Sequence, residues 1–457
     1  MNRIDGYNLL HQGVIALSEV ENNGMRVDTA YLDLAITKTA ARIKYLEDAL
    51  RTCTEYKLQR RRFGLNTNMR SREQLATVLF DEMGHDPATM TAGGKPQLDE
   101  TALERIGTQY AKDFLQLEKL SKLHGTYLLG VRREVEGEYV HCFFGLHLVR
   151  SYRGQSDSPN LQNIPIRDPL QGKIIRRAFI PRPGNALIET DYSSLEVMVA
   201  CALSGDKKLT YDATEGDMHR DMAAECYLLP PGGVLKPVRQ TAKGGFVFAE
   251  FYGDWYKQVT KNLWDGIERG HLTTPDGVGL AEHLATQGIT GRGACDPKVD
   301  PVEGTFEKHI QGVEDRFWNK RFRVYHAKRK AWIEEYKQQG YIDLVTGFRC
   351  MGPMSKNQVM NYHIQGPAFH CLLWSLITLQ REIKQRGMGA KIIGQIHDSI
   401  IGDVPLAEVD DYLHLVQDIT TNRIRREWDW ITVPFKIEAE MATTNWYEKK
   451  GVALPLL

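Results

Sequence analysis

Two aspartates far apart in the sequence each follow a short apolar run that is typical of a β-strand. Asp191 comes after Ala186-Leu-Ile-Glu, and Asp398 comes after Lys391-Ile-Ile-Gly. Because such runs predict strands, two strand ends would present both carboxylates side by side. Paired carboxylates supply the hard oxygen ligands of two Mg²⁺ ions, which neutralise charge and align the groups in phosphoryl transfer. The two aspartates therefore indicate a two-metal phosphoryl-transfer site.

A third segment lies between the aspartates and carries positive charge. It reads Arg239-Gln-Thr-Ala-Lys243 and is followed by Phe251-Tyr-Gly253. Arg239 and Lys243 are one helical turn apart and face the same way, so both can bind a triphosphate that arrives with the metal ions. Taken singly each signal is weak, since an aspartate at a strand end is more often a cap or turn residue.

The three segments in this order resemble motifs A, B and C of the DNA polymerase I family (family A). Motif A is Glu189-Thr-Asp-Tyr-Ser-Ser-Leu-Glu196 and motif C is Gly394-Gln-Ile-His-Asp-Ser399. Further runs resemble the family's sequence around these motifs: residues 19–28, Ser158-Pro-Asn-Leu-Gln-Asn-Ile-Pro-Ile-Arg167, Gly216-Asp-Met-His-Arg220 and Asn361-Tyr-His-Ile-Gln-Gly366. The resemblance covers nearly the whole chain, so chance explains it poorly.

The resemblance implies an α+β chain with the right-hand polymerase fold, which has an antiparallel-sheet palm, helical fingers and a helical thumb. The expected parts are a segment leading into the palm (1–28), the thumb (29–130), the first part of the palm with motif A (131–204), the fingers with motif B (205–340) and the second part of the palm with motif C (341–457). The turn-forming run Thr91-Ala-Gly-Gly-Lys-Pro96 would be the thumb tip over the duplex minor groove.

Local sequence patterns agree with this division. Helical periodicity runs from Thr29 to about Leu50 and over 115–123, and a long helix is expected from Lys356 to about Arg386. Short alternating apolar runs over 131–204 predict strands, whereas 205–340 is mainly helical. We therefore expect the chain to form a helical lobe, a strand-rich palm and a second helical lobe.

A loop-rich insertion is expected at about 265–305, because the chain there is longer than the family usually needs. Together with the motif B run Phe246-Val-Phe-Ala-Glu-Phe-Tyr-Gly253, the insertion resembles a bacteriophage branch of the family. The sequence does not assign its role: contact with the template or a partner and a plain surface elaboration stay open.

The resemblance assigns catalysis to Asp191 and Asp398, which would bind two Mg²⁺ ions that Mn²⁺ can replace. The backbone carbonyl of Tyr192 would be a further metal ligand. Ser399 stands where many members of the family have a glutamate, so no third carboxylate is expected. The incoming dNTP would be bound by side chains of motifs A and B and of the start of the fingers: Glu196, His219, Arg239, Lys243, Phe248 and Tyr252.

Some of these roles concern the choice of substrate. In the family a glutamate at the position of Glu196 excludes a 2′-hydroxyl, although a palm salt bridge is an alternative role. Phe248 and Tyr252 would stack on the base pair, with core packing as the alternative for Phe248. Primer-template contacts would come from Arg153, Gln162, Asn163, Asn361, Gln365 and His397. Such donors test pair geometry, because purine N3 and pyrimidine O2 accept hydrogen bonds in every correct pair.

One interval in motif B departs from the family's spacing. Lys243 and Phe248 are five residues apart, where the family has four. A helix commonly absorbs one inserted residue as a π-bulge. Gly244 and Gly245 lie at this point, and each costs about 1 kcal/mol relative to alanine in a helix. We therefore predict a bulge or broken turn over 243–247.

Composition limits the classes of function. The chain has 457 residues, and its 58 Lys and Arg equal its 58 Asp and Glu, so DNA contacts must come from local basic patches. Its seven cysteines show no zinc-binding spacing. No signal core or membrane-length apolar run is present. These features favour a cytoplasmic protein, in a bacterial host if a phage encodes it, that does not contact a membrane.

The features together predict a template-directed DNA polymerase that adds dNTPs to a primer 3′-OH and releases pyrophosphate, as a monomer in phage DNA replication. Only about thirty residues precede the expected thumb, so no 3′–5′ exonuclease is expected on this chain. The sequence leaves open whether a separate exonuclease or processivity factor is a partner of this chain. Two alternatives are a single-subunit RNA polymerase, against which Glu196 and the 160–165 run argue, and a non-catalytic DNA-binding replication subunit.

Overall fold

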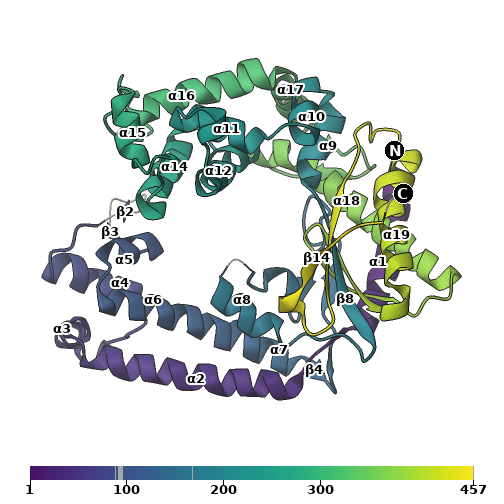
Figure 1. Cartoon of the computed structure of the whole chain (residues 1–457), viewed down its shortest axis with the longest axis horizontal. Helices are drawn as coiled ribbons and strands as arrows, with labels where there is room; N and C mark the ends of the chain where they lie inside the picture. Colours follow the sequence, from purple (N-terminus) through teal and green to yellow (C-terminus); the bar gives the residue numbers. More distant parts are fainter. Residues whose placement is uncertain (88, 91–95, 167, 456–457) are drawn as a thin grey trace.

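The computed structural model describes residues 1–87, 89–90, 96–166 and 168–455. Three parts surround a central opening in Figure 1: a helical lobe built from α2 to α7, a second helical lobe built from α10 to α17, and a sheet with its covering helices. We call these parts the thumb, the fingers and the palm. The thumb-tip turn expected at 91–96 lies outside the described residues, except for Pro96. The expected domain boundaries stay predictions.

The palm contains a five-stranded antiparallel sheet. Its strand order is β11-β12-β8-β13-β14. The strands are β8 (Asn185–Tyr192), β11 (Lys391–Ile396), β12 (Ser399–Pro405), β13 (Ile437–Ala442) and β14 (Lys450–Val452). Motif A thus lies on the central strand, and the motif C turn joins its neighbour β12 to β11. The antiparallel palm sheet that the sequence predicts is confirmed.

Both faces of this sheet are buried, which explains the consecutive apolar residues in its strands. Alternate side chains belong to two hydrophobic clusters. Leu187, Ile393 and Ile401 pack with residues of the thumb. Ile188, Ile392 and Ile400 pack with residues of the palm helices and the fingers. One face of the sheet therefore shares a hydrophobic cluster with the thumb, and the fingers are joined to the other face through the helices that cover it.

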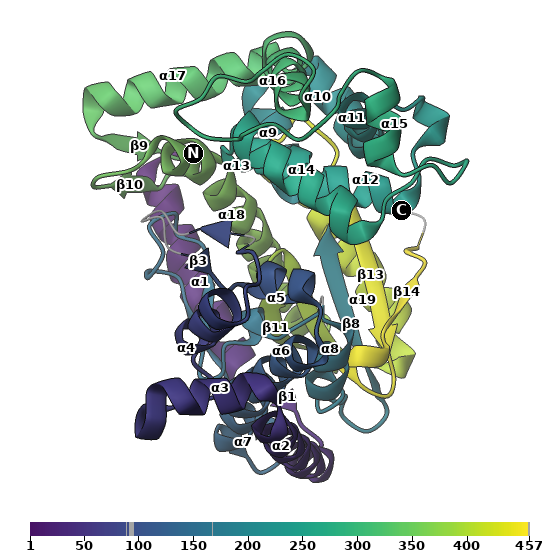
Figure 2. The same ribbon diagram turned by 90° about the vertical axis from the view of Figure 1, so that its left-hand side faces the viewer.

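Helices cover the face of the sheet that Ile188 occupies. They are α1 (Arg3–Asn23), α9 (Leu195–Ser204), α18 (Lys356–Gln385), α19 (Val409–Gln417) and α20 (Ile424–Glu427). α1 and α18 contact each other and β11, and α19 contacts β12. Figure 2 shows α18 running from the fingers down to the sheet. It begins at a capping box formed by Ser355 and Gln358, and its bounds confirm the long helix expected from Lys356.

The thumb is a helical lobe in which α2 packs along α6. Its helices are α2 (Thr29–Thr52), α3 (Thr54–Phe63), α4 (Arg72–Ala76), α5 (Glu100–Ile106), α6 (Gln109–Lys122) and α7 (Leu129–Arg133), with π-helical turns η2 (Thr77–Glu82) and η3 (Leu123–Leu128). Small two- and three-stranded sheets lie at its edges: β1 (Met25–Arg26) with β5 (Tyr139–Val140) and β4 (Val135–Glu136), and β2 (Thr89–Met90) with β3 (Pro96–Gln97).

The expected strand-rich segment over 131–204 is only partly composed of strands. β4 to β8 are present, and they include the hairpin of β6 (Phe143–Gly145) and β7 (Gln155–Asp157). The segment also contains α8 (Pro169–Arg176), and its last ten residues form α9. Leu195 to Cys201 are apolar at nearly every position, and a run of this kind does not distinguish a buried helix from a strand.

The fingers are helical, as expected, and the loop-rich segment within them is anchored. Their helices are α10 (Lys207–Thr214), α11 (Met218–Tyr227), α12 (Lys236–Ala242), α13 (Ala249–Tyr252), α14 (Tyr256–Gly270), α15 (Leu280–Thr286), α16 (Phe306–Arg316) and α17 (Arg323–Gln339). The buried ammonium of Lys257 donates to the carbonyls of Asp296 and Val299 and lies 3.6 Å from the buried Glu307 carboxylate. The segment before α16 is therefore fixed to the rest of the fingers.

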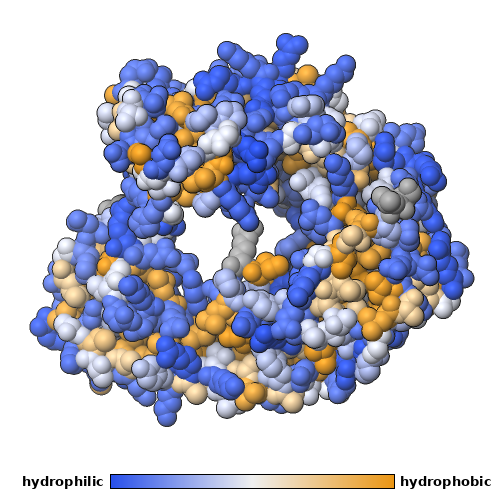
Figure 3. Space-filling view, viewed as in Figure 1, coloured by the Kyte–Doolittle hydropathy of each residue, from blue (hydrophilic) through white to orange (hydrophobic). Residues whose placement is uncertain are grey.

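The thumb and the fingers touch each other across the opening. Arg105 Nη2 on α5 lies 3.0 Å from Glu268 Oε2 on α14, and Trp264 Nε1 donates to the other oxygen of Glu268. Arg269 on α14 donates to the hydroxyl of Thr101 on α5. The space-filling view in Figure 3 shows the opening enclosed by the three parts. None of the described helices is long and apolar enough to cross a membrane.

Buried neutral histidines predict a loss of stability in acid. Burial lowers the pKa values of His363 and His370 to about 3, against an ordinary value of 6.5. The unfolded chain therefore binds more protons between pH 6.5 and pH 3, and stability falls as the pH falls through this window. The expected slope is up to about 1.4 kcal/mol per pH unit for each histidine.

Unfolding measured between pH 7 and pH 4.5 checks this expectation. The imidazole of His370 forms a hydrogen bond with Thr346 Oγ1 at 2.6 Å and stacks on Phe348. The His370→Gln variant keeps a polar side chain at this position but removes the group that binds a proton. The variant is expected to show a shallower dependence of stability on pH than the wild type. The exposed His11→Gln is the control. Equal slopes for the wild type and His370→Gln would contradict the assignment.

Candidate active site

Asp191 and Asp398 lie next to each other where β8 meets the turn between β11 and β12. Asp191 pairs in register with Ser399, the residue that follows Asp398. The backbone N–H of Tyr192 donates to the carbonyl of Asp398 at 3.2 Å. His397 has φ of 50°, a left-handed conformation that lets two residues reverse the chain. Strand pairing therefore brings together two carboxylates that are far apart in the sequence.

The two carboxylates form a negative site that nearby cations compensate only in part. Burial, and after it the charge of Asp398, raises the pKa of Asp191 to about 7. Burial also raises the pKa of Asp398, although Arg153 and His397 oppose the shift. Like charges that are forced together in this way favour a bound cation.

Other carboxylates lie along the same face of the sheet. Glu438 on β13 is opposite Asp191, and Glu189 is two residues before it on β8. Glu189 is already paired, since Lys449 Nζ lies 2.6 Å from its Oε2 and Trp446 Nε1 donates to the same oxygen at 2.7 Å. Burial alone would raise the pKa of Glu189, but these contacts hold it below its usual range. Glu189 is thus neutralised by close protein groups, whereas Asp398 is approached by Arg153 only to 4.0 Å.

The donors at this point fit Mg²⁺. The available ligands are the carboxylate oxygens of Asp191 and Asp398 and the backbone carbonyl of Tyr192. Within the described part of the chain, no group of three or more His, Cys, Asp or Glu residues could hold a metal ion. Mg²⁺ commonly binds through one or two carboxylates and keeps water or substrate phosphate as its other ligands. The side chain of Tyr192 is excluded as a ligand because its hydroxyl is buried against Ser375.

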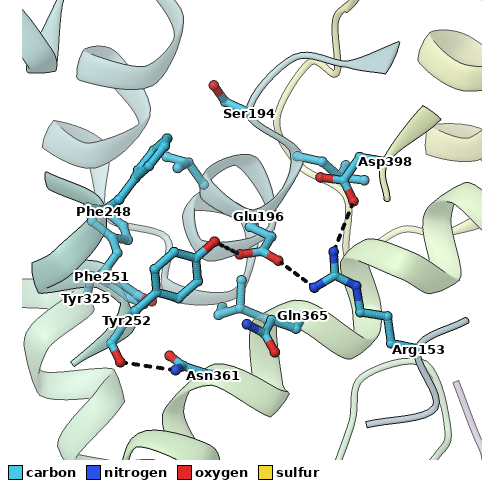
Figure 4. Close-up of a pocket in the computed structure, with 13 residues that line it drawn as sticks. Arg153, Ser194, Glu196, Phe248, Phe251, Tyr252, Tyr325, Asn361, Gln365 and Asp398 are labelled. Atoms are coloured by element: carbon cyan, nitrogen blue, oxygen red, sulfur yellow. Dashed lines mark hydrogen bonds and ion pairs between the residues drawn. The ribbon is translucent and has the colours of Figure 1, made fainter. Parts of the chain in front are cut away.

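A cavity of about 180 Å³ lies beside Asp398, between the palm and the fingers (Figure 4). Its lining residues are Arg153, Ser194, Leu195, Glu196, Val197, Phe248, Phe251, Tyr252, Tyr325, Asn361, Ile364, Gln365 and Asp398. Tyr252 Oη donates to Glu196 Oε2 at 3.0 Å. Arg153 lies 3.6 Å from Glu196 and 4.0 Å from Asp398. Contacts through Tyr252, Glu196 and Arg153 therefore connect helix α13 of the fingers to Asp398.

The predicted triphosphate-binding residues gather on the fingers, beside Phe248. The His219 ring meets Phe248 edge-on with 5.8 Å between ring centroids, and Lys243 Nζ is 5.3 Å from the Phe248 ring centroid. Burial, followed by the charges of Lys243 and Arg239, lowers the pKa of His219 to about 4. Two cations and a neutral histidine therefore face one region. None of the three lines the 180 Å³ cavity.

The predicted interruption in motif B is confirmed. Residues Lys243–Phe248 form a π-helical turn, η6, between α12 and α13. A π-helix accommodates one residue more per turn than the helices on either side. The turn starts at Lys243 and contains both glycines, as the spacing predicts.

The predicted DNA-binding residues lie in three places. Asn361 and Gln365 on α18 line the cavity together with Arg153, and Asn361 donates to the Tyr252 carbonyl at 3.1 Å. Gln162 instead donates to Gln395, which in turn donates to the His397 carbonyl. Asn163 lines a separate hollow of about 490 Å³ at the base of the thumb, with Lys122 and Tyr127.

Sequence reasoning missed several residues of the site. Tyr325 lines the cavity from α17, far along the chain from motif B, and nothing in its neighbourhood marks it. Ser194 adopts a left-handed conformation at the start of α9. Asp217 forms an ion pair with Arg239, at 2.9 Å. Two of them had a signal in the sequence: Ser194 lies within motif A, and Asp217 stands two residues before His219 at a helix start.

The family is identified by a match that covers most of the chain. The model of "DNA polymerase family A" matches residues 36–271 and 306–448. The chain belongs to this family. The match is interrupted at 272–305, within the segment expected to be an insertion.

Curated relatives and a solved structure agree with this assignment. The chain is 27% identical to the thermostable DNA polymerase I of Thermus thermophilus, over 95% of this chain and 47% of that protein. It is 26% identical to DNA polymerase I of Chloroflexus aurantiacus, over 96% of this chain and 42% of that protein. The chain therefore spans about half the length of the curated relatives it matches.

The fold is also that of a solved polymerase domain. The structure described as "POL domain of Pol1 from M. smegmatis complex with DNA primer-template and dNTP" matches with a TM-score of 0.73 at 22% identity. The match covers 95% of this chain and 70% of that chain. The right-hand polymerase fold that the sequence predicts is thereby confirmed.

Proposed function

We propose that this chain is a template-directed DNA polymerase that extends a primer with dNTPs and releases pyrophosphate. The observation that carries the proposal is the meeting of Asp191 and Asp398 beside a cavity that contains Glu196 and Tyr252. Membership of DNA polymerase family A supports it. Nucleotide addition forms a bond between the primer 3′-oxygen and the α-phosphorus and breaks the bond to the leaving pyrophosphate, while the 3′-hydroxyl loses its proton.

Each group of the site has a task in this reaction. Asp191, Asp398 and the Tyr192 carbonyl would bind two Mg²⁺ ions, which neutralise charge and align the reacting oxygens. Arg239 and Lys243 would bind the triphosphate and offset the charge that develops on pyrophosphate. With its pKa near 4, His219 is neutral at physiological pH and would donate one N–H to the phosphates.

Selection of the sugar rests on Glu196. Its carboxylate is held at the cavity wall by the Tyr252 hydroxyl and by Arg153. A carboxylate fixed in this way would exclude a 2′-hydroxyl on the sugar of a bound nucleotide. Burial raises the pKa of Glu196, but Arg153 opposes the shift. The hydrogen bond also ties Tyr252, and hence the end of motif B, to motif A.

Glu196→Ala is therefore expected to relax the choice of sugar. A fixed group that rejects one hydroxyl contributes about 1–3 kcal/mol, which corresponds to roughly 10–200-fold. The kcat/KM ratio of dNTP over rNTP is expected to fall by that factor, measured by primer extension with single nucleotides. Glu282→Ala, an exposed position on α15, is the control. An unchanged ratio would assign Glu196 to a structural salt bridge.

Primer extension with Mg²⁺ tests the proposed function directly. The wild type is expected to extend a primer on a DNA template with four dNTPs and not with four rNTPs. Preference for rNTPs would identify a single-subunit RNA polymerase. A gel shift of primer-template without extension would identify a non-catalytic DNA-binding subunit.

Several finer assignments stay predictions. They are membership of a bacteriophage-like branch, a role in phage DNA replication, the replacement of Mg²⁺ by Mn²⁺, a monomeric state, a cytoplasmic location, and a separate exonuclease or processivity factor as partner. The interruption of the family match at 272–305 supports the first of them. The antiparallel palm and the fold of the solved polymerase domain support primer-template DNA as the substrate.

A further inference from the structure

Asp217 joins two parts of the predicted triphosphate-binding group. It is the N-cap of α11, where its Oδ1 accepts the backbone N–H of Arg220 at 3.1 Å. The same carboxylate contacts Nε of Arg239 on α12, with Oδ1 at 3.0 Å and Oδ2 at 2.9 Å. His219 follows two residues later on α11. One carboxylate thus contacts Arg239 and caps the helix that carries His219.

The geometry of the contact leaves the other end of Arg239 available. Both carboxylate oxygens approach Nε, and no hydrogen bond of the Arg239 Nη groups is formed among the described residues. A guanidinium has five donors, so the Nη groups can still bind phosphate oxygens. The Arg239 side chain is about one third exposed, at 34%. A long side chain at such a position is otherwise free to adopt many rotamers.

Asp217 is ionised at the pH at which a polymerase works. Burial would raise its pKa, but the hydrogen bond from Arg239 and the N–H of Arg220 hold the pKa below its usual range. Arg220 is also close, with Nε 3.6 Å from Oδ2 of Asp217. The carboxylate is therefore a permanent acceptor for Arg239 rather than a proton donor or acceptor.

We propose that Asp217 is a positioning residue for the incoming nucleotide, which fixes the guanidinium of Arg239 so that its Nη groups face the triphosphate. The proposal deepens the proposed function and rests on it. Asp217 itself does not touch the nucleotide, because its two oxygens are occupied by Arg239 and by the end of α11. Its effect is transmitted through Arg239.

A double-mutant cycle with Arg239 tests the proposal. Asp217→Asn keeps an N-cap oxygen but loses the charge-assisted contact to Arg239. We expect KM for dNTP to rise about tenfold with kcat changed less than about twofold, because binding of the nucleotide is weakened before and during the reaction alike. In an Arg239→Ala background, Asp217→Asn is expected to cause no further rise in KM, because the guanidinium through which Asp217 acts on the nucleotide is absent.

Two further variants separate positioning from helix capping. Serine at position 217 also caps a helix but has no carboxylate to pair with Arg239. The Asp217→Ser variant is therefore expected to show the same tenfold rise in KM. Asp28→Asn makes the same change at the N-cap of α2 in the thumb and is expected to leave KM unchanged. An unchanged KM in the folded Asp217→Asn and Asp217→Ser variants overturns the proposal. An equal rise in KM with and without Arg239 also overturns it.

The outcomes distinguish this proposal from the proposed function. If the wild type does not extend primers, the proposed function fails, and binding of a dNTP is then measured directly by titration calorimetry. Tenfold weaker binding by Asp217→Asn than by the wild type would still support Asp217 as a positioning residue. Absence of any dNTP binding by the wild type would overturn both proposals.

Discussion

Asp398→Asn is expected to reduce primer extension about a thousandfold or more. The substitution keeps the size of the side chain and removes one of the two charges that bind Mg²⁺. A thousandfold loss corresponds to about 4 kcal/mol of transition-state stabilisation, which is the scale of a metal site that neutralises developing charge. Single-turnover extension of a labelled primer with saturating Mg²⁺ and dNTP measures the loss.

The same variant is expected to remain folded and to bind primer-template DNA. Because the charge of Asp398 helps to raise the pKa of Asp191, its removal relieves repulsion, and the melting temperature is expected to stay the same or increase. Asp411→Asn at an exposed position of α19 is the control for the chemical change. Extension by folded Asp398→Asn at close to the wild-type rate would refute the assignment of the site.

Deletion of one glycine in the π-helical turn is expected to be tolerated, whereas deletion of both is not. The turn η6 contains one residue more than a regular helix, so removal of Gly244 shortens the interval from Lys243 to the present Phe248 from five residues to four. An ordinary α-helix then keeps both side chains on their present faces. Primer extension by this variant is expected to stay within about tenfold of the wild type.

Removal of Gly244 and Gly245 together is the matched comparison. The second deletion rotates the following residues by about 100° relative to Lys243, since an α-helix has 3.6 residues per turn. Phe248 and Tyr252 would leave the cavity, and the contact from Tyr252 to Glu196 would be lost. A loss of at least about 100-fold is expected on the scale of a misplaced substrate-binding group. Equal activity of the two deletion variants would contradict the assigned register.

The parts that the sequence predicted are those controlled by local pattern. The apolar runs before Asp191 and Asp398 form β8 and β11, and the interval between Lys243 and Phe248 forms a π-turn. In both cases the signal lies within a few residues. The buried helix α9 lies in a segment that the sequence predicts to be rich in strands, because a run of apolar residues has no distinctive period when every face is buried.

The parts that the sequence did not predict depend on contacts between distant segments. Tyr325 enters the cavity because α17 packs on α9 and α18, and no local motif records this packing. Lys449 neutralises Glu189 because β14 pairs with β13 at the edge of the sheet. Motif spacing could suggest Asp191 as a ligand but could not tell that Glu189, two residues away, is already paired.

The contact between α5 of the thumb and α14 of the fingers closes the molecule into a ring around its central opening. A linear duplex can thread such a ring from its end, but a circular primed template has no end to thread. If the chain is the proposed polymerase, such a template would enter while the contacts of Arg105 and Arg269 are broken. An exposed ion pair contributes only about 0–1 kcal/mol and weakens with salt, so the contact between the thumb and the fingers is expected to break easily. Salt would therefore speed both loading on and escape from circular DNA.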